Sequence, residues 1–154
     1  MKCYRTYLSI GLLLLFISEA SFAQKGYNYL NLSPGVNFEK GYNFKIGIER
    51  SNAQYNGWEL YFEGYERSET KNWMLGIMFK KNILRSRNLY SSLNFGGQGG
   101  TDEENFIGGV NAGPELGYFF FDNFAFFLYQ KNDYVFGAEN GFRHYIMAGI
   151  KIPF

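Results

Sequence analysis

The chain has 154 residues, and its 15 basic and 14 acidic side chains nearly cancel. This balance offers no positive field for nucleic acid and no acidic tail for storing cations, so we expect no direct contact with nucleic acid. Aromatic residues make up 21% of the chain, and 19 residues are glycine. A soluble core has little use for so many large rings, whereas a β-sheet that faces lipid does.

Residues 1–23 have the layout of a cleavable secretory signal peptide. Two bases precede an apolar run from Leu8 to Ile17, and a small-residue pattern ends at Ala23. The run of about ten apolar residues is too short for a spanning helix, which needs roughly 20, so we favour cleavage over an uncleaved anchor. Cys3 is the only cysteine and lies inside this segment, so the mature chain has no disulfide. Residues 24–154 then form one domain, exported by a Sec-type route.

Beyond Gln24 the apolar residues recur with a period of two, which is typical of β-strands, and no stripe of helical period is long enough for a helix. In the second of these stretches, Ile46 and Ile48 fall on one face, opposite Lys45 and Glu49. Eight stretches alternate in this way, at residues 29–38, 41–50, 56–65, 72–81, 89–97, 109–120, 124–131 and 144–154.

Two architectures suit eight amphipathic strands: a soluble barrel or sandwich with an apolar interior, or a membrane barrel with an apolar exterior. The polar faces combine Asn, Ser, Gly, Glu and Lys, which suits a narrow polar lumen. We therefore predict an all-β fold, an eight-stranded antiparallel up-and-down transmembrane β-barrel of the outer-membrane type. Charged residues on the predicted inner faces could pair across the lumen, among them Lys45, Glu59, Glu63, Glu115 and Lys151.

The last strand ends on Phe154 without a polar tail. Lipid cannot satisfy an open sheet edge, so this strand must pair with the first one. A closing strand of this kind resembles the signal that the outer-membrane barrel assembly machinery recognises. Pro34 and Pro114 fall inside strand patterns, and each predicts a bulge or a strand end, because proline cannot donate to the ladder.

An even number of strands places both termini on one side, which we expect to be periplasmic. The predicted periplasmic turns are residues 51–54, the basic stretch 80–87 and the dipeptide Asp122-Asn123. The predicted outer connections include GGQGGTDEEN, residues 96–105, and the stretch from Asp133 to Gly141.

Several short motifs in the second half of the chain resemble a known family. The motif TDEENF supplies Asp102, Glu103, Glu104, Asn105 and Phe106, and the turn Asp122-Asn123-Phe124 and a closing strand from Gly149 to Phe154 follow it. This order resembles the TraO proteins of conjugative transposons, and a looser similarity reaches the WELYFEGYE segment and the signal peptide. The resemblance implies a role in conjugal DNA transfer without catalytic activity.

Candidate chemistry is sparse. The acids 102–104 could ligate calcium through oxygen atoms, or they could form a solvated loop without a metal, since they lack EF-hand spacing. His144 could belong to a lipid-esterase triad, but its place at the start of the last strand favours an interfacial girdle. Trp58 and Trp73 begin apolar faces and are typical of interfacial anchors. We expect no enzyme and no cofactor.

Two functional hypotheses remain. The first is a component of a conjugative transfer apparatus in the outer membrane of a Gram-negative bacterium. The second is a general small barrel of the OmpX or OmpA type that serves adhesion or envelope integrity. Expected partners are outer-membrane lipid, the barrel assembly machinery during biogenesis, and other conjugation proteins. The residues predicted to contact partners are Asp102, Glu103, Glu104, Asn105, Lys80, Lys81, Arg85 and Arg87.

Overall fold

A computed structural model describes residues 26–38, 41–67, 70–102, 105–121, 123–138 and 141–154. The predicted signal peptide lies outside the described residues. The described part of the chain contains no helix that is long and apolar enough to cross a bilayer. Its strands are β1 (Tyr27–Asn37), β2 (Tyr42–Ser51), β3 (Gly57–Arg67), β4 (Thr70–Arg85), β5 (Leu89–Thr101), β6 (Phe106–Phe121), β7 (Phe124–Phe136) and β8 (Phe142–Pro153).

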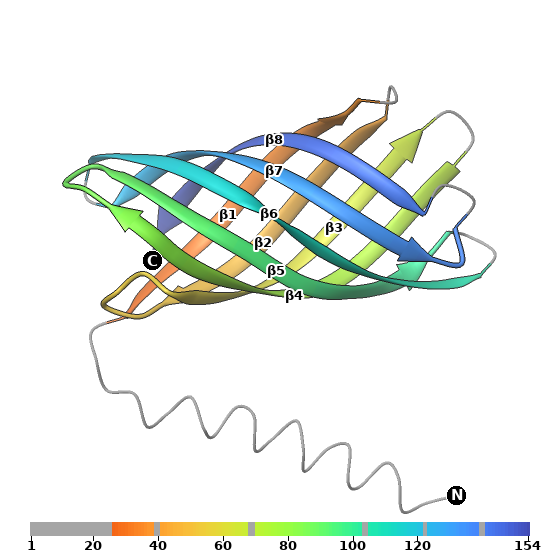
Figure 1. Cartoon of the computed structure of the whole chain (residues 1–154), viewed down its shortest axis with the longest axis horizontal. Coiled ribbons are helices and arrows are strands. Elements are labelled where there is room, and N and C mark those ends of the chain that lie inside the picture. The colour runs from red at the N-terminus through yellow and green to blue at the C-terminus, as the bar shows by residue number, and fades with distance from the viewer. Residues whose placement is uncertain (1–25, 39–40, 68–69, 103–104, 122, 139–140) are drawn as a thin grey trace, which may run out of the picture.

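The eight strands form one closed antiparallel barrel, in which each strand pairs with the next and β8 pairs with β1. The predicted strands and their closure are therefore confirmed. The start of β1 and the end of β8 lie at the same end of the barrel (Figure 1). We call this the terminal end. It also carries the connections β2–β3, β4–β5 and β6–β7, and the four other connections lie at the distal end.

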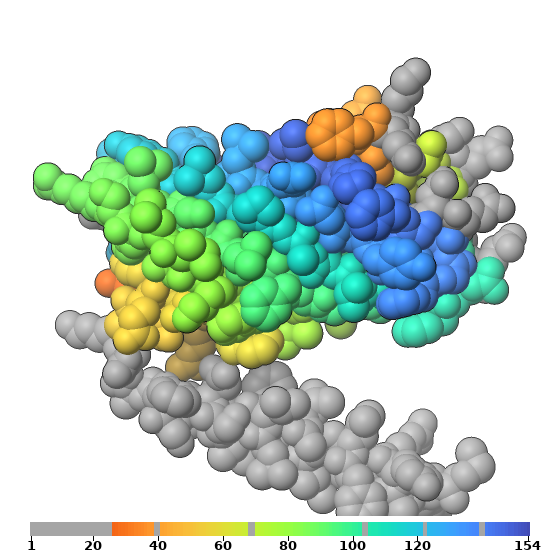
Figure 2. Space-filling view, viewed as in Figure 1, coloured from red at the N-terminus to blue at the C-terminus, as the bar shows by residue number. Residues whose placement is uncertain are grey.

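Buried and exposed side chains alternate along the strands, but charged side chains face the interior and apolar ones face outward, the reverse of a soluble barrel. On β2, Lys45 is 0% exposed and Glu49 is 3% exposed, whereas Ile48, the residue before Glu49, is 56% exposed. On β4, Ile77 is 53% exposed beside a buried methionine. The outer side chains form a continuous wall on the face seen in Figure 2. An apolar belt around a polar interior suits hydrocarbon, so the predicted assignment of the strand faces is confirmed.

Pro34 and Pro114 lie within β1 and β6, so the prediction that they mark bulges or strand ends is wrong. Each pairs in register with one neighbouring strand, opposite Phe44 and Leu93 respectively. On the other side, pairing with β8 or β7 is interrupted at the proline and resumes without a shift. A proline has no backbone N–H, so the strand loses one hydrogen bond to one of its two neighbours and otherwise continues.

Several predicted turns are strands instead. Residues 80–85 belong to β4, which leaves 86–88 as the β4–β5 connection, so the predicted basic turn is wrong in its placement. Gly96 and Gly100 of the predicted outer loop lie in β5, so close to β4 that a Cβ at either position would clash with its backbone. Asp133 lies inside β7. Glycine-rich and charged segments resemble loops in sequence, because the β4 backbone beside these glycines and the carboxylates that pair with Lys80 lie on other strands.

Candidate functional site

The largest group of buried charges lies in the barrel interior and contains three lysines and three glutamates. Lys80 is its centre, because its Nζ lies 2.7 Å from carboxylate oxygens of both Glu49 and Glu59. The third carboxylate around Lys80, that of Glu115, is 3.2 Å away. We call this group the first ion cluster, and it comprises Lys45, Glu49, Glu59, Lys80, Glu115 and Lys151.

The other members of the first ion cluster complete a continuous network. Lys151 Nζ lies 2.9 Å from Glu49 Oε2 and 2.9 Å from Glu115 Oε1. Lys45 Nζ lies 3.0 Å from Glu59 Oε1. Each carboxylate therefore contacts at least one ammonium group, and this compensates for its removal from water.

A second ion cluster consists of Glu63, Lys131 and Asp133. Lys131 bonds to Glu63 and lies 2.9 Å from Asp133 Oδ2. Gln98 connects the cluster to its polar surroundings, since it donates to Asp133 at 3.2 Å and accepts from the Tyr61 hydroxyl at 2.8 Å. These hydrogen bonds satisfy polar atoms that no bulk water reaches.

The interior charges balance within the described residues. Four lysines and Arg143 face four glutamates and Asp133, and each of these ten side chains is at most 4% exposed. An eight-stranded barrel encloses only enough room for side chains, and here ion-paired side chains fill it together with buried tyrosine, phenylalanine and methionine side chains. The arrangement leaves no continuous aqueous passage through the described interior.

An aromatic cap closes the barrel at the terminal end. Tyr55 has a φ of 60°, and its ring stacks on Tyr27 at 5.5 Å between centroids. The guanidinium carbon of Arg85 lies 3.2 Å from the centre of the Tyr55 ring and 4.6 Å from that of Phe119. Burial raises the pKa of the Tyr55 hydroxyl, so the phenol stays neutral and its contact with Arg85 is a cation–π interaction.

A small polar cavity lies behind the cap, lined by residues that include Tyr29, Lys151 and Ser92. Its volume of about 10 Å³ matches a single water molecule. The cavity is therefore too small for a substrate or a cofactor.

The four basic residues predicted to contact partners occupy four different environments. Lys80 is 1% exposed and belongs to the first ion cluster, so it cannot reach a partner. Arg85 is held in the aromatic cap. Lys81 lies on the outer wall of β4, and Arg87 lies in the β4–β5 connection, and both are exposed.

The acidic residues predicted to contact partners lie at the distal end. Asp102 and Asn105 close the β5–β6 connection, where the Asn105 N–H donates to Asp102 Oδ1 at 2.8 Å. Their backbones pair as well, with Asp102 N–H donating to the Asn105 carbonyl at 3.2 Å. Glu103 and Glu104 lie outside the described residues, so the calcium hypothesis stays a prediction.

His144 lies on the outer wall of β8, half-buried. Its Nδ1 is 2.7 Å from Asn132 Oδ1, and its ring meets Phe142 edge-on at 4.5 Å. These contacts, made with an amide and a ring, contain neither the serine nor the carboxylate of a hydrolase triad. The two tryptophans also lie outside the barrel, with Trp58 48% exposed near the terminal end and Trp73 50% exposed near the distal end.

The architecture matches solved membrane barrels. A de novo designed transmembrane β-barrel aligns with a TM-score of 0.59 and 14% identity, over 85% of this chain and 98% of the design. Neisserial surface protein A (NspA) aligns with a TM-score of 0.58 and 13% identity, over 84% of this chain and 96% of that protein. The fold is that of a transmembrane β-barrel. The designed barrel TMB2.3 agrees, with a TM-score of 0.56 at 11% identity over 86% of this chain and 97% of the design.

No family model matches the chain, and no curated protein matches it in sequence. At these identities the structural likeness concerns the fold alone.

Half of the ten interior charges are absent from the pairing residues predicted from the sequence. Lys80 and Asp133 are predicted in connections, and Glu49, Lys131 and Arg143 are not among the predicted pairing residues. A signal for Lys131 exists, because it continues the inward face of β7 two positions beyond Tyr129. No local signal identifies the aromatic cap, since Tyr55 lies in a connection and meets residues of three other segments.

Proposed function

We propose that this protein is a small outer-membrane barrel that acts through contacts made at its two ends, without transport or catalysis. The observation that carries this proposal is the interior, which paired charges fill together with buried tyrosine, phenylalanine and methionine side chains. A filled lumen transports nothing, and every interior lysine is already held by carboxylates. The surfaces left for interaction are the connections and the outer wall.

The orientation proposed here places the terminal end in the periplasm and the distal end outside the cell. An exported chain with an even number of strands leaves both termini on the side from which it inserts. The acidic TDEEN segment then faces the exterior, and Arg87 faces the periplasm.

The finer form of the proposal is a component of a conjugative transfer apparatus. It is supported by the resemblance of TDEENFIGGV, the Asp122-Asn123-Phe124 turn and the closing strand to the TraO proteins. The candidate contacts are Glu103 and Glu104 on the distal side and Arg87 on the terminal side. The alternative is a general small outer-membrane barrel that serves adhesion or envelope integrity, and NspA, a protein of this fold, is named as a surface protein.

Deletion of the gene in a donor strain separates these two functions. Transfer frequency and sensitivity to detergent are measured together, in the deletion strain and in the same strain complemented with the gene. A conjugation component predicts lost transfer with an intact envelope, and restoration on complementation. Normal transfer with an increased sensitivity to detergent would assign the general envelope role instead.

A second experiment tests the contact surfaces. The double variant Glu103→Lys/Glu104→Lys leaves unchanged the Asp102–Asn105 pair that closes the connection. Arg87→Glu likewise changes neither the cap nor the ion clusters. Either change should reduce transfer while the amount of folded barrel stays constant, and undiminished transfer in both would show that these connections are not the interface.

A further inference from the structure

Two exposed bases lie on the outer wall near the terminal end. Arg50 is the penultimate residue of β2, and Lys81 lies in the terminal third of β4. Neither forms an ion pair with any residue that the structure describes. Lys71 near the distal end behaves differently, because its Nζ lies 3.3 Å from Glu66.

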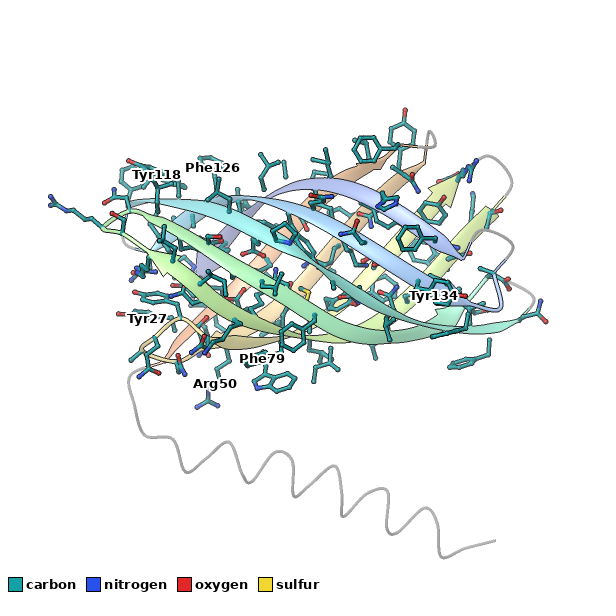
Figure 3. All side chains as sticks on the ribbon, in the orientation of Figure 1. Tyr27, Arg50, Phe79, Tyr118, Phe126 and Tyr134 are labelled. Atoms are coloured by element: carbon teal, nitrogen blue, oxygen red, sulfur yellow. The ribbon has the colours of Figure 1, made fainter. Side chains whose placement is uncertain are left out.

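The two bases flank a pair of aromatic rings. Arg50 pairs across strands with Trp58, which pairs with Phe79 on β4. The Trp58 and Phe79 rings lie 4.9 Å apart. Lys81 is two positions beyond Phe79, on the same face of the same strand. Arg50 and Phe79 both point away from the barrel in Figure 3.

Described acidic side chains are absent from this part of the wall. They lie either in the interior, as Glu49 and Glu59 do, or at the distal end, as Glu66 and Asp102 do. The terminal carboxylate of Phe154 is the nearest negative group by strand order, and it forms no ion pair with Arg50. Among the described side chains, this part of the wall therefore carries only positive charge.

Along the strands, the part of the outer wall next to these bases on the side of the barrel's middle is apolar. Leu60 follows Trp58 on the outer face of β3 and is 54% exposed, and Ile77 precedes Phe79 on β4 and is 53% exposed. A ligand at this place meets hydrocarbon-like side chains on one side and two cations on the other. A phospholipid with an anionic headgroup has this division between its acyl chains and its phosphate.

We propose that Arg50, Lys81 and the Trp58–Phe79 ring pair form a binding site for the headgroup of an anionic phospholipid. We call it the lipid site. It lies in the leaflet that surrounds the terminal end. The bases stand on strands two positions apart in the sheet, roughly 10 Å, on either side of the Trp58–Phe79 ring pair. The long side chains of Arg50 and Lys81 reach a phosphate group held over these rings by turning along the wall. The rings hold the glycerol region at the interface, where aromatic side chains are favoured. The proposal rests on the proposed residence in a membrane.

Trp58 serves as the reporter in the test. The variant Trp73→Phe retains Trp58 as the single tryptophan, and it is folded into phosphatidylcholine vesicles. Phosphatidylglycerol or phosphatidylcholine with brominated acyl chains is then added at equal mole fractions, and quenching of Trp58 gives the relative affinity of the site. We expect a preference for phosphatidylglycerol of roughly tenfold. High salt should reduce this preference, because exposed charges are screened.

Two comparisons identify the source of the preference. In the same background, Arg50→Gln/Lys81→Gln should abolish it. The reciprocal variant Trp58→Phe reports from Trp73, beside the Lys71–Glu66 pair, and should show no preference. Equal quenching by both lipids, or a preference that survives loss of both bases, would overturn the lipid site.

Faster migration of the unheated protein than of the heated protein on SDS gels verifies that each variant has folded. This separate measurement distinguishes failure of the lipid site from failure of membrane residence. If the double variant does not fold, Arg50→Gln and Lys81→Gln are measured singly, and each should lower the preference about threefold.

Discussion

Removing the charge of Lys80 should be among the most damaging single changes in the barrel. In Lys80→Met, the first ion cluster keeps three carboxylates and only two ammonium groups, all almost fully buried. Breaking a buried ion pair from one side costs about 3–5 kcal/mol of stability. With a urea dependence of roughly 2 kcal/mol per molar, the midpoint of unfolding should fall by about 2 M.

A second substitution should repair the defect. Glu49→Gln added to Lys80→Met leaves two complete pairs, Lys45–Glu59 and Lys151–Glu115, so the double variant should recover at least half of the lost stability. Urea unfolding in lipid vesicles, followed by tryptophan fluorescence, measures all three proteins.

The control for Lys80→Met is Lys71→Met. It breaks a pair whose side chains are 50% and 61% exposed, so it should cost less than about 1 kcal/mol. A midpoint for Lys80→Met within about 0.5 M of the parent, or a double variant no more stable than the single one, would refute the argument that charge balance stabilises the interior.

Three further outcomes are expected. Ile77→Arg, on the outer wall, should impair assembly more than Ser92→Arg in the lumen, since a cation at the bilayer midplane costs about 2–4 kcal/mol. The amount of heat-modifiable protein measures assembly of both variants, and the reverse order would mean that the faces are inverted. Gly76→Ala should destabilise the barrel by about 1–3 kcal/mol, because its Cβ would overlap a buried tyrosine ring. Gly97→Ala should be tolerated, because its Cβ would meet only a carbonyl oxygen at 3.8 Å. Equal urea midpoints for the two variants would contradict this. Planar bilayers should show no stable conductance of porin size, and its appearance would disprove the filled lumen.

The sequence by itself determined the strands and their faces. Alternation is a local property, because successive side chains on a strand point to opposite sides. Lys45 and Glu49 on one side of Ile46 and Ile48 therefore already indicated which face was polar. The sequence also indicated closure, since the last strand ends in an alternating pattern that lipid would leave unpaired.

Local pattern was insufficient where the strand signal weakened. Lys80 and Lys81 are adjacent bases and resemble a turn in sequence, yet β4 continues through both and directs one inward and the other outward. Only the three carboxylates around Lys80, on other strands, show why a lysine belongs at that inward position.

Tertiary structure alone decided which charges pair. Lys151 and Glu49 are 102 residues apart in sequence, yet Lys151 Nζ donates to Glu49 Oε2 at 2.9 Å. Closure of the barrel makes this possible, because it places β8 beside β1 and two strands from β2. The cap formed by Tyr55, Arg85 and Phe119 depends in the same way on the β2–β3 connection meeting the ends of β4 and β6. Alternation specifies the side of the wall for each residue, but the stagger of the strands around the closed barrel specifies its neighbours across the lumen, and that stagger is a property of all eight strands together.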